Sequence, residues 1–122
     1  MPPQATPVPV EIKFRTESRL LDVRFDDGAR FELPFEYLRV FSPSAEVKGH
    51  GGGEGLLVTG KEAVGINGVE PIGQYAVRLV FDDGHDTGLY SWTLLYDLGR
   101  NRDRNWARYL ERCAAAGHQR AP

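Results

Sequence analysis

The four-residue sequence Phe-Asp-Asp-Gly occurs twice in this chain, at residues 25–28 and again, 56 residues later, at residues 81–84. Each copy ends a segment in which apolar and polar residues alternate. The apolar positions are Leu21, Val23 and Phe25 before the first turn, and Val77, Leu79 and Phe81 before the second. Alternation with a period of two is typical of a half-buried strand, and Asp-Gly is typical of a tight type I′ hairpin turn. The repeat therefore predicts two β-hairpins.

A short helix is expected after each turn. Pro34 suits the first turn of a helix, and Phe35 and Leu38 follow it with helical spacing. After the second turn, Ser91 is a good N-cap for a helix over residues 92–98, and Gly99 is placed to end that helix. The chain thus contains two units, each a hairpin followed by a short helix.

The last segment predicts a longer helix over residues 101–117. Trp106, Tyr109, Leu110 and Cys113 recur at i, i+3, i+4 and i+7, which makes one apolar helical stripe, and Gly117 ends it. Residues 56–60, 63–74 and 75–84 are further strand candidates. Together these elements predict the α+β class, as a β-rich single domain with two hairpin-plus-short-helix units and a C-terminal helix.

Length and composition fit one domain. The 122 residues suit a single core over residues 11–117, with disordered tails at residues 1–10 and 118–122. The glycine-rich stretch at residues 42–55 is expected to be a mobile loop. A net charge of −2 argues against a nucleic-acid partner, and the lack of a long apolar run argues against a membrane. One cysteine and no secretory signal pattern favour the cytoplasm.

His85 follows the second turn directly, between Asp83 and Asp86, whereas the first turn has Ala29 there. A hydrogen-bonded structural histidine is favoured, because a zinc site needs three or four nitrogen or sulfur ligands and no CxxC or HxxxH spacing is present. The alternative is a weak zinc or iron site. Its ligands would be His85 with Asp86, Glu46 or His50.

Two stretches, "LRVFSPSAEVKGHG" and "EPIGQYAVRLVFDDGHDTGLYSWTLLYDLG", resemble a small bacterial family of unknown function that matches the N-terminal domain of gamma-butyrobetaine hydroxylase. The resemblance covers about residues 12–113, and similar modules are appended to Mrp-type iron–sulfur carrier proteins. It implies a zinc-binding accessory module in which the zinc-binding histidine corresponds to His85. The cysteine ligands would correspond to Ser42, Ser44 and Val47, so this chain lacks three of the four ligands.

The function predicted from these observations is a non-catalytic binding or adaptor module. The resemblance implies a protein partner, linked to iron–sulfur or cofactor metabolism. No enzyme activity is expected, because the hydroxylase's catalytic domain is absent and Cys113 falls on the buried stripe. A metal-binding accessory protein and an uncharacterised enzyme are the alternatives. The expected partner-binding residues are Ser42, Ser44, His50, Asp83, His85, Tyr90 and Trp92.

Overall fold

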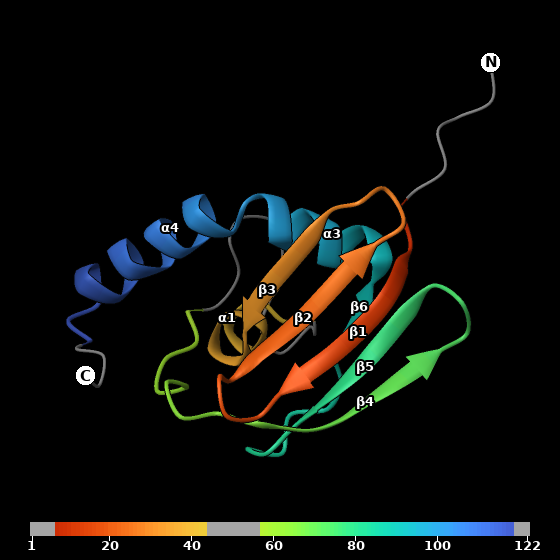
Figure 1. Cartoon of the computed structure of the whole chain (residues 1–122). Helices are drawn as coiled ribbons and strands as arrows, with labels where there is room; N and C mark the ends of the chain where they lie inside the picture. Colours follow the sequence, from red (N-terminus) through yellow and green to blue (C-terminus); the bar gives the residue numbers. More distant parts are fainter. Residues whose placement is uncertain (1–6, 44–56, 119–122) are drawn as a thin grey trace.

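The computed structural model describes residues 7–43 and 57–118. In this part of the chain, two three-stranded antiparallel sheets pack with three helices, which confirms the α+β single domain (Figure 1). The elements are β1 Pro9–Arg15, β2 Leu20–Phe25, β3 Arg30–Pro34, α1 Phe35–Val40, β4 Ile66–Ile72, β5 Ala76–Phe81, β6 Leu89–Ser91, α3 Trp92–Arg100 and α4 Arg102–Ala115.

The two sheets repeat one plan. Their strand orders are β1-β2-β3 and β4-β5-β6, and the central strands β2 and β5 are displaced by the same 56 residues as the turns. Each first strand also carries a register shift near its start, between Pro9 and Glu11 in one sheet and between Ile66 and Gly68 in the other. The predicted repeat of hairpin and short helix is therefore confirmed.

The turns differ from the expected type I′ geometry. Gly28 and Gly84 have φ of 91° and 92°, whereas neither Asp27 nor Asp83 is among the described residues with positive φ. The Phe25 N–H donates to the Ala29 carbonyl at 2.8 Å, so each loop has three residues and ends on a left-handed glycine. The aspartate stabilises this loop, because Asp27 Oδ1 accepts the Ala29 N–H at 2.9 Å.

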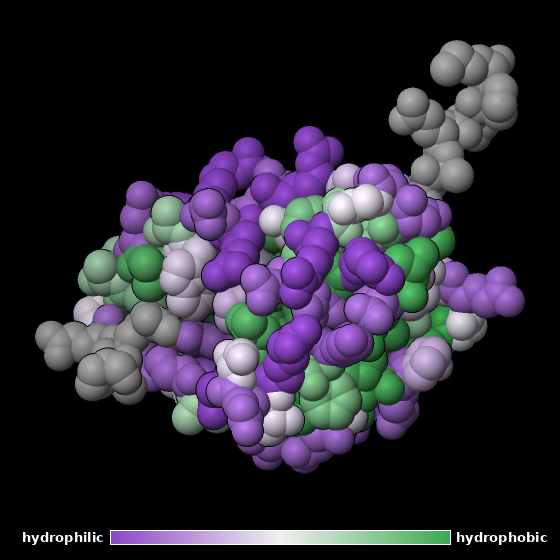
Figure 2. Space-filling view, in the orientation of Figure 1, coloured by the Kyte–Doolittle hydropathy of each residue, from purple (hydrophilic) through white to green (hydrophobic). Residues whose placement is uncertain are grey.

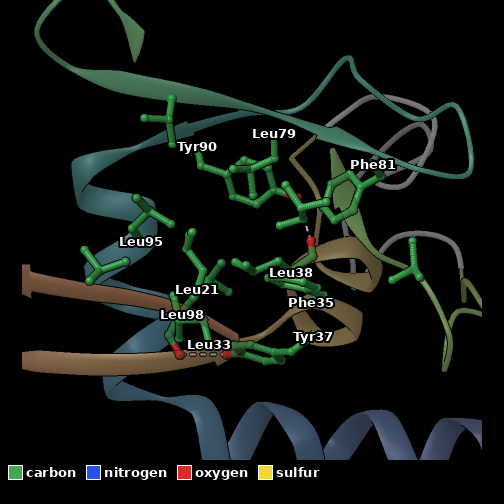
Figure 3. Close-up of a cluster of buried hydrophobic side chains, with 14 of the residues drawn as sticks. Leu21, Leu33, Phe35, Tyr37, Leu38, Leu79, Phe81, Tyr90, Leu95 and Leu98 are labelled. Atoms are coloured by element: carbon green, nitrogen blue, oxygen red, sulfur yellow. Dashed lines mark hydrogen bonds between the residues drawn. The ribbon is translucent and has the colours of Figure 1, made fainter. Parts of the chain in front are cut away.

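The core lies between the two sheets and the first two helices. The alternating residues of β2 and β5 face it as predicted, and Leu21, Val23 and Leu79 have no exposed surface. Helices α1 and α3 contribute apolar side chains to the same cluster, and Figure 3 shows Leu38, Leu95 and Leu98 among them. Ser91 caps α3 as expected, because its hydroxyl accepts the Leu94 N–H at 3.1 Å.

Gly99 does not end α3, which continues to Arg100. A Cβ atom built on Gly99 would lie 2.3 Å from Cγ of Phe31, so this glycine permits close packing of α3 on β3. Residues 57–60, part of an expected strand, contain no strand, whereas β6 is the second strand of the hairpin predicted around Asp83 and Gly84.

The apolar stripe of α4 is narrower than predicted. Tyr109 and Cys113 are 2% exposed, whereas Leu110 is 39% exposed and Trp106 is half-buried between two clusters. Gly117 ends the helix as expected, with φ of 77° and the His118 N–H donating to the Cys113 carbonyl at 2.9 Å. Among the helices of the described residues, none has the length and apolar character needed to cross a membrane.

Candidate functional site

The end of α1 and the turn between β5 and β6 meet in a buried polar contact. Ser42 Oγ lies 2.9 Å from His85 Nε2, and the two residues are 1% and 6% exposed. His85 takes the place that Ala29 has in the first repeat, since its carbonyl accepts the Phe81 N–H at 3.0 Å as the Ala29 carbonyl accepts that of Phe25. The histidine thus adds a side-chain contact with the α1 end to a turn that forms without it.

Glycine allows the chain segments at this contact to approach closely. A Cβ atom on Gly88 would lie 2.5 Å from Ser42 Oγ and 3.2 Å from Cε1 of Tyr90. The His85 ring also lies 6.1 Å from the ring of Phe81, centroid to centroid, so the imidazole packs near an aromatic side chain as well. These neighbours hold the imidazole inside the protein.

Asp83 joins the same turn to two cations. Its Oδ2 lies 2.9 Å from Arg39 Nε and 2.6 Å from Lys61 Nζ, and its Oδ1 accepts the His85 N–H at 3.1 Å. Burial alone would raise the pKa of Asp83, but Lys61, the His85 N–H and Arg39 outweigh it and hold this pKa at about 2. The turn is therefore fixed by ion pairs as well as by the Ser42 contact.

Tyr90 connects β6 to α1 beneath this network. Its side chain has no exposed surface, and its hydroxyl donates to the Leu38 carbonyl at 2.5 Å (Figure 3). Burial raises the pKa of Tyr90 well above its usual range, and the hydroxyl stays protonated as a donor. Tyr90 thus supports the site from within and is not exposed to a partner.

The structure separates Trp92 from Ser42, Asp83 and His85. Its indole N–H donates to the Gln74 carbonyl at 2.7 Å, and its backbone N–H donates to the Tyr75 carbonyl at 3.0 Å. This position is at the start of β5, whereas His85 follows the end of that strand. Asp86 is half-exposed, 3.9 Å from Arg78 Nη1. Ser44, Glu46 and His50 lie outside the described residues.

Sequence reasoning missed Arg39 and Lys61. Arg39 is 44 residues away from Asp83, and it sits in the last turn of α1, where a basic residue is common in any helix. Lys61 lies in a segment without helix or strand. No local pattern marks either residue as the partner of a distant carboxylate.

The described residues do not fit a zinc or iron site. Across residues 7–43 and 57–118, no group of three or more histidine, cysteine, aspartate or glutamate side chains is placed to hold a metal ion. The neighbour of His85 Nε2 is the Ser42 hydroxyl, which is a poor ligand for zinc. The predicted co-ligands Glu46 and His50 are outside the described residues, so that combination stays a prediction.

The ion pairs of Asp83 predict an acid-dependent loss of stability. The pKa of Asp83 in the folded protein, about 2, is below the ordinary 3.8. The ionised Asp83 carboxylate therefore makes its full contribution to the free energy of unfolding above about pH 4, and this contribution is lost as the pH falls through 2. Over this pH range we expect the free energy of unfolding of the wild type to fall by about 1–2 kcal/mol more than that of an Asp83→Asn variant. Urea unfolding at several pH values measures the difference. Asp82→Asn, in the exposed part of the same turn, is the control, and equal pH profiles for all three proteins would contradict the prediction.

Residues 12–96 match the family described as gamma-butyrobetaine hydroxylase-like, N-terminal. The curated proteins contain no match to the chain.

Solved structures similar to this chain include the following three. Two are solution NMR structures, and both have a TM-score of 0.83. The first is 54% identical in sequence and covers 100% of this chain and 92% of its own chain. The second is 47% identical and covers 97% of this chain and 93% of its own chain. The third is a crystal structure of a protein of unknown function, of the DUF971 family, from Acidithiobacillus ferrooxidans. It is 42% identical over 75% of this chain and 91% of that one, with a TM-score of 0.63.

Proposed function

The chain belongs to the gamma-butyrobetaine hydroxylase-like N-terminal family, and from this membership we propose that it is a non-catalytic cytoplasmic module that binds a protein partner. The match is to an N-terminal part, and the similar protein from Acidithiobacillus ferrooxidans is of unknown function. The resemblance to modules appended to iron–sulfur carriers makes a protein of iron–sulfur or cofactor metabolism the partner class that we propose.

The observation that carries this proposal is the burial of the polar residues at the site. A serine hydroxyl 2.9 Å from an imidazole could serve nucleophilic catalysis, but Ser42 and His85 are 1% and 6% exposed. Asp83 accepts from the His85 backbone N–H and pairs with cations, which differs from the orienting role of a triad aspartate. The contacts therefore favour a rigid support over a reaction centre.

The surface that this support holds is the turn over residues 82–87. Asp82 and Thr87 are exposed, and the Asp86 side chain is 48% exposed. Because the conformation of the turn is fixed before binding, a partner would not have to order it. The exposed residue Asp82 and the half-exposed side chain of Asp86, which also lies near Arg78, carry carboxylates that favour a basic patch on the partner.

Site-specific photocrosslinking in cells tests this surface. A photoreactive residue at position 82 and one at position 87 are expected to crosslink to the same partner protein. The same residue at the exposed position 104 on α4 is not expected to crosslink to that protein. Reversing the charges of Asp82 and Asp86 should reduce the crosslink from position 87. The proposal fails if positions 82, 87 and 104 give the same pattern.

The alternative of a metal-binding accessory protein has one observation in its favour. Ser42 and His85, which the resemblance places at two ligand positions, are in contact. Elemental mass spectrometry of natively purified wild type and His85→Ala separates the two functions. Stoichiometric zinc or iron that is lost in the variant would support a metal site with ligands outside the described residues. The absence of metal from both the wild type and the variant would favour the protein-binding module.

A further inference from the structure

Strand β1 is an edge strand with unusually exposed apolar side chains. It pairs with β2 on one side and ends the order β1-β2-β3. Val10 and Phe14 are 56% and 44% exposed, and Val8, which precedes the strand, is 40% exposed. Figure 2 shows hydrophobic surface along this side of the molecule, in the region of β1, β4 and β5. An edge of this kind is a template for pairing with a further strand.

The apolar side chains of β1 lie on the core side of its sheet. Ile12 is opposite Val23 and Phe14 is opposite Leu21, and side chains of opposite residues project from the same face. Ile12 is half-buried against the core, whereas the Phe14 side chain is exposed to solvent. Glu11 and Lys13 occupy the other face, where they form a 3.6 Å ion pair.

The alternation of hydrogen bonds shows which backbone groups of β1 face outward. The Phe25 N–H is directed to the β3 side, where it donates to Ala29, so those of Asp22 and Arg24 are directed to β1. Asp22 and Arg24 are opposite Lys13 and Glu11, whose backbone groups therefore face β2. The N–H and C=O groups of Ile12 and Phe14 consequently point away from the sheet.

We propose that β1 pairs with β1 of a second copy of this chain, antiparallel, about a two-fold axis at Ile12. In this register Glu11 is opposite the partner's Lys13, and Val10 is opposite the partner's Phe14, in both copies. The outward backbone groups of Ile12 pair with each other, which places Glu11 and Lys13 in the closer, non-hydrogen-bonded type of pair. Charge, apolar contact and backbone direction thus agree in one symmetric register.

Val10 lies at the register shift between Pro9 and Glu11, so its pair with the partner's Phe14 is the last pair of the ladder, because such irregularities end a regular ladder. Lysine on an edge strand normally discourages association. In the proposed register, however, Lys13 meets a carboxylate in the partner, so the same residue selects this alignment over others. The resulting sheet has six strands, with β3 at both edges.

Charge exchange at two positions tests the register. Sedimentation equilibrium of the full chain should show a reversible dimer with a dissociation constant between about 10 µM and about 1 mM. Glu11→Lys and Lys13→Glu, each alone, should weaken the dimer about tenfold, because each makes both symmetric pairs repulsive. The double exchange should restore it. A mixture of the two single variants should form the heterodimer, since every pair is then attractive.

The mixture separates loss of pairing from damage to the fold, because a misfolded variant would not form a heterodimer. A second comparison uses Phe14, whose N–H faces outward: Phe14→Pro should weaken the dimer further than Phe14→Ala without loss of folded protein. A wild type that stays monomeric at about 1 mM would overturn the proposal. So would a dimer whose dissociation constant is the same in all charge variants.

Discussion

Replacement of Tyr37 by alanine is expected to lower the free energy of unfolding by about 3–5 kcal/mol. The side chain is 1% exposed, and its ring lies 5.1 Å from that of Phe41 and 6.2 Å from that of Trp106, between centroids. Its hydroxyl donates to the Leu98 carbonyl at 2.7 Å (Figure 3) and accepts from Asn105 Nδ2 at 3.0 Å. Because Tyr37 thus joins α1 to both α3 and α4, its loss affects all three helices.

The matched variant Tyr37→Phe retains the ring and removes only the hydroxyl. It leaves the buried Leu98 carbonyl and the Asn105 amide without this partner, and we expect a loss of about 1–2 kcal/mol. Urea unfolding followed by circular dichroism measures both variants. A loss below about 1 kcal/mol for alanine would show that the helices do not depend on this contact.

Gly99→Ala is expected to destabilise the protein by about 1–3 kcal/mol, although alanine normally stabilises a helix relative to glycine by about 1 kcal/mol. The sign is reversed because the new Cβ would lie 2.3 Å from Cγ and 2.4 Å from Cδ2 of Phe31. That ring packs edge-on against Phe25 and Tyr96, and these contacts oppose its displacement.

A double variant tests the cause of this loss. In a Phe31→Leu background, which removes the ring from the path of the Cβ, Gly99→Ala should cost much less than in the wild type. Thermal unfolding of the four proteins gives the coupling between the two positions. A Gly99→Ala protein that is more stable than the wild type would contradict the close packing of α3 on β3.

Features set by neighbouring residues could be predicted from the sequence. The alternation in β2 and β5, the Ser91 cap and the glycine that ends α4 each depend on local backbone geometry. The predictions for Gly99 and Leu110 are wrong because the roles of these two residues depend on contacts with distant parts of the chain. Whether a helical glycine ends a helix or permits close packing, and which side of a stripe is covered, depends on distant residues such as Phe31.

The same distinction applies to the candidate site. His85 can be identified from the sequence because it interrupts an otherwise repeated turn, and the resemblance points to Ser42, which the structure places beside it. The ion pairs of Asp83 with Arg39 and Lys61 could not be predicted, because they join segments that are far apart in the chain. Sequence proximity groups Trp92 with His85, but β6 and the start of α3 place Trp92 at the other end of β5.

The most direct test of the site is a double-mutant cycle on Ser42→Ala and His85→Ala, measured as free energies of unfolding with and without a metal chelator. His85→Ala gives the second turn the sequence of the first, so the hairpin itself should still form. If the histidine secures the turn to the α1 end, the coupling is about 1–2 kcal/mol and is the same in both buffers. A coupling near zero, or one that disappears in chelator, would contradict this account.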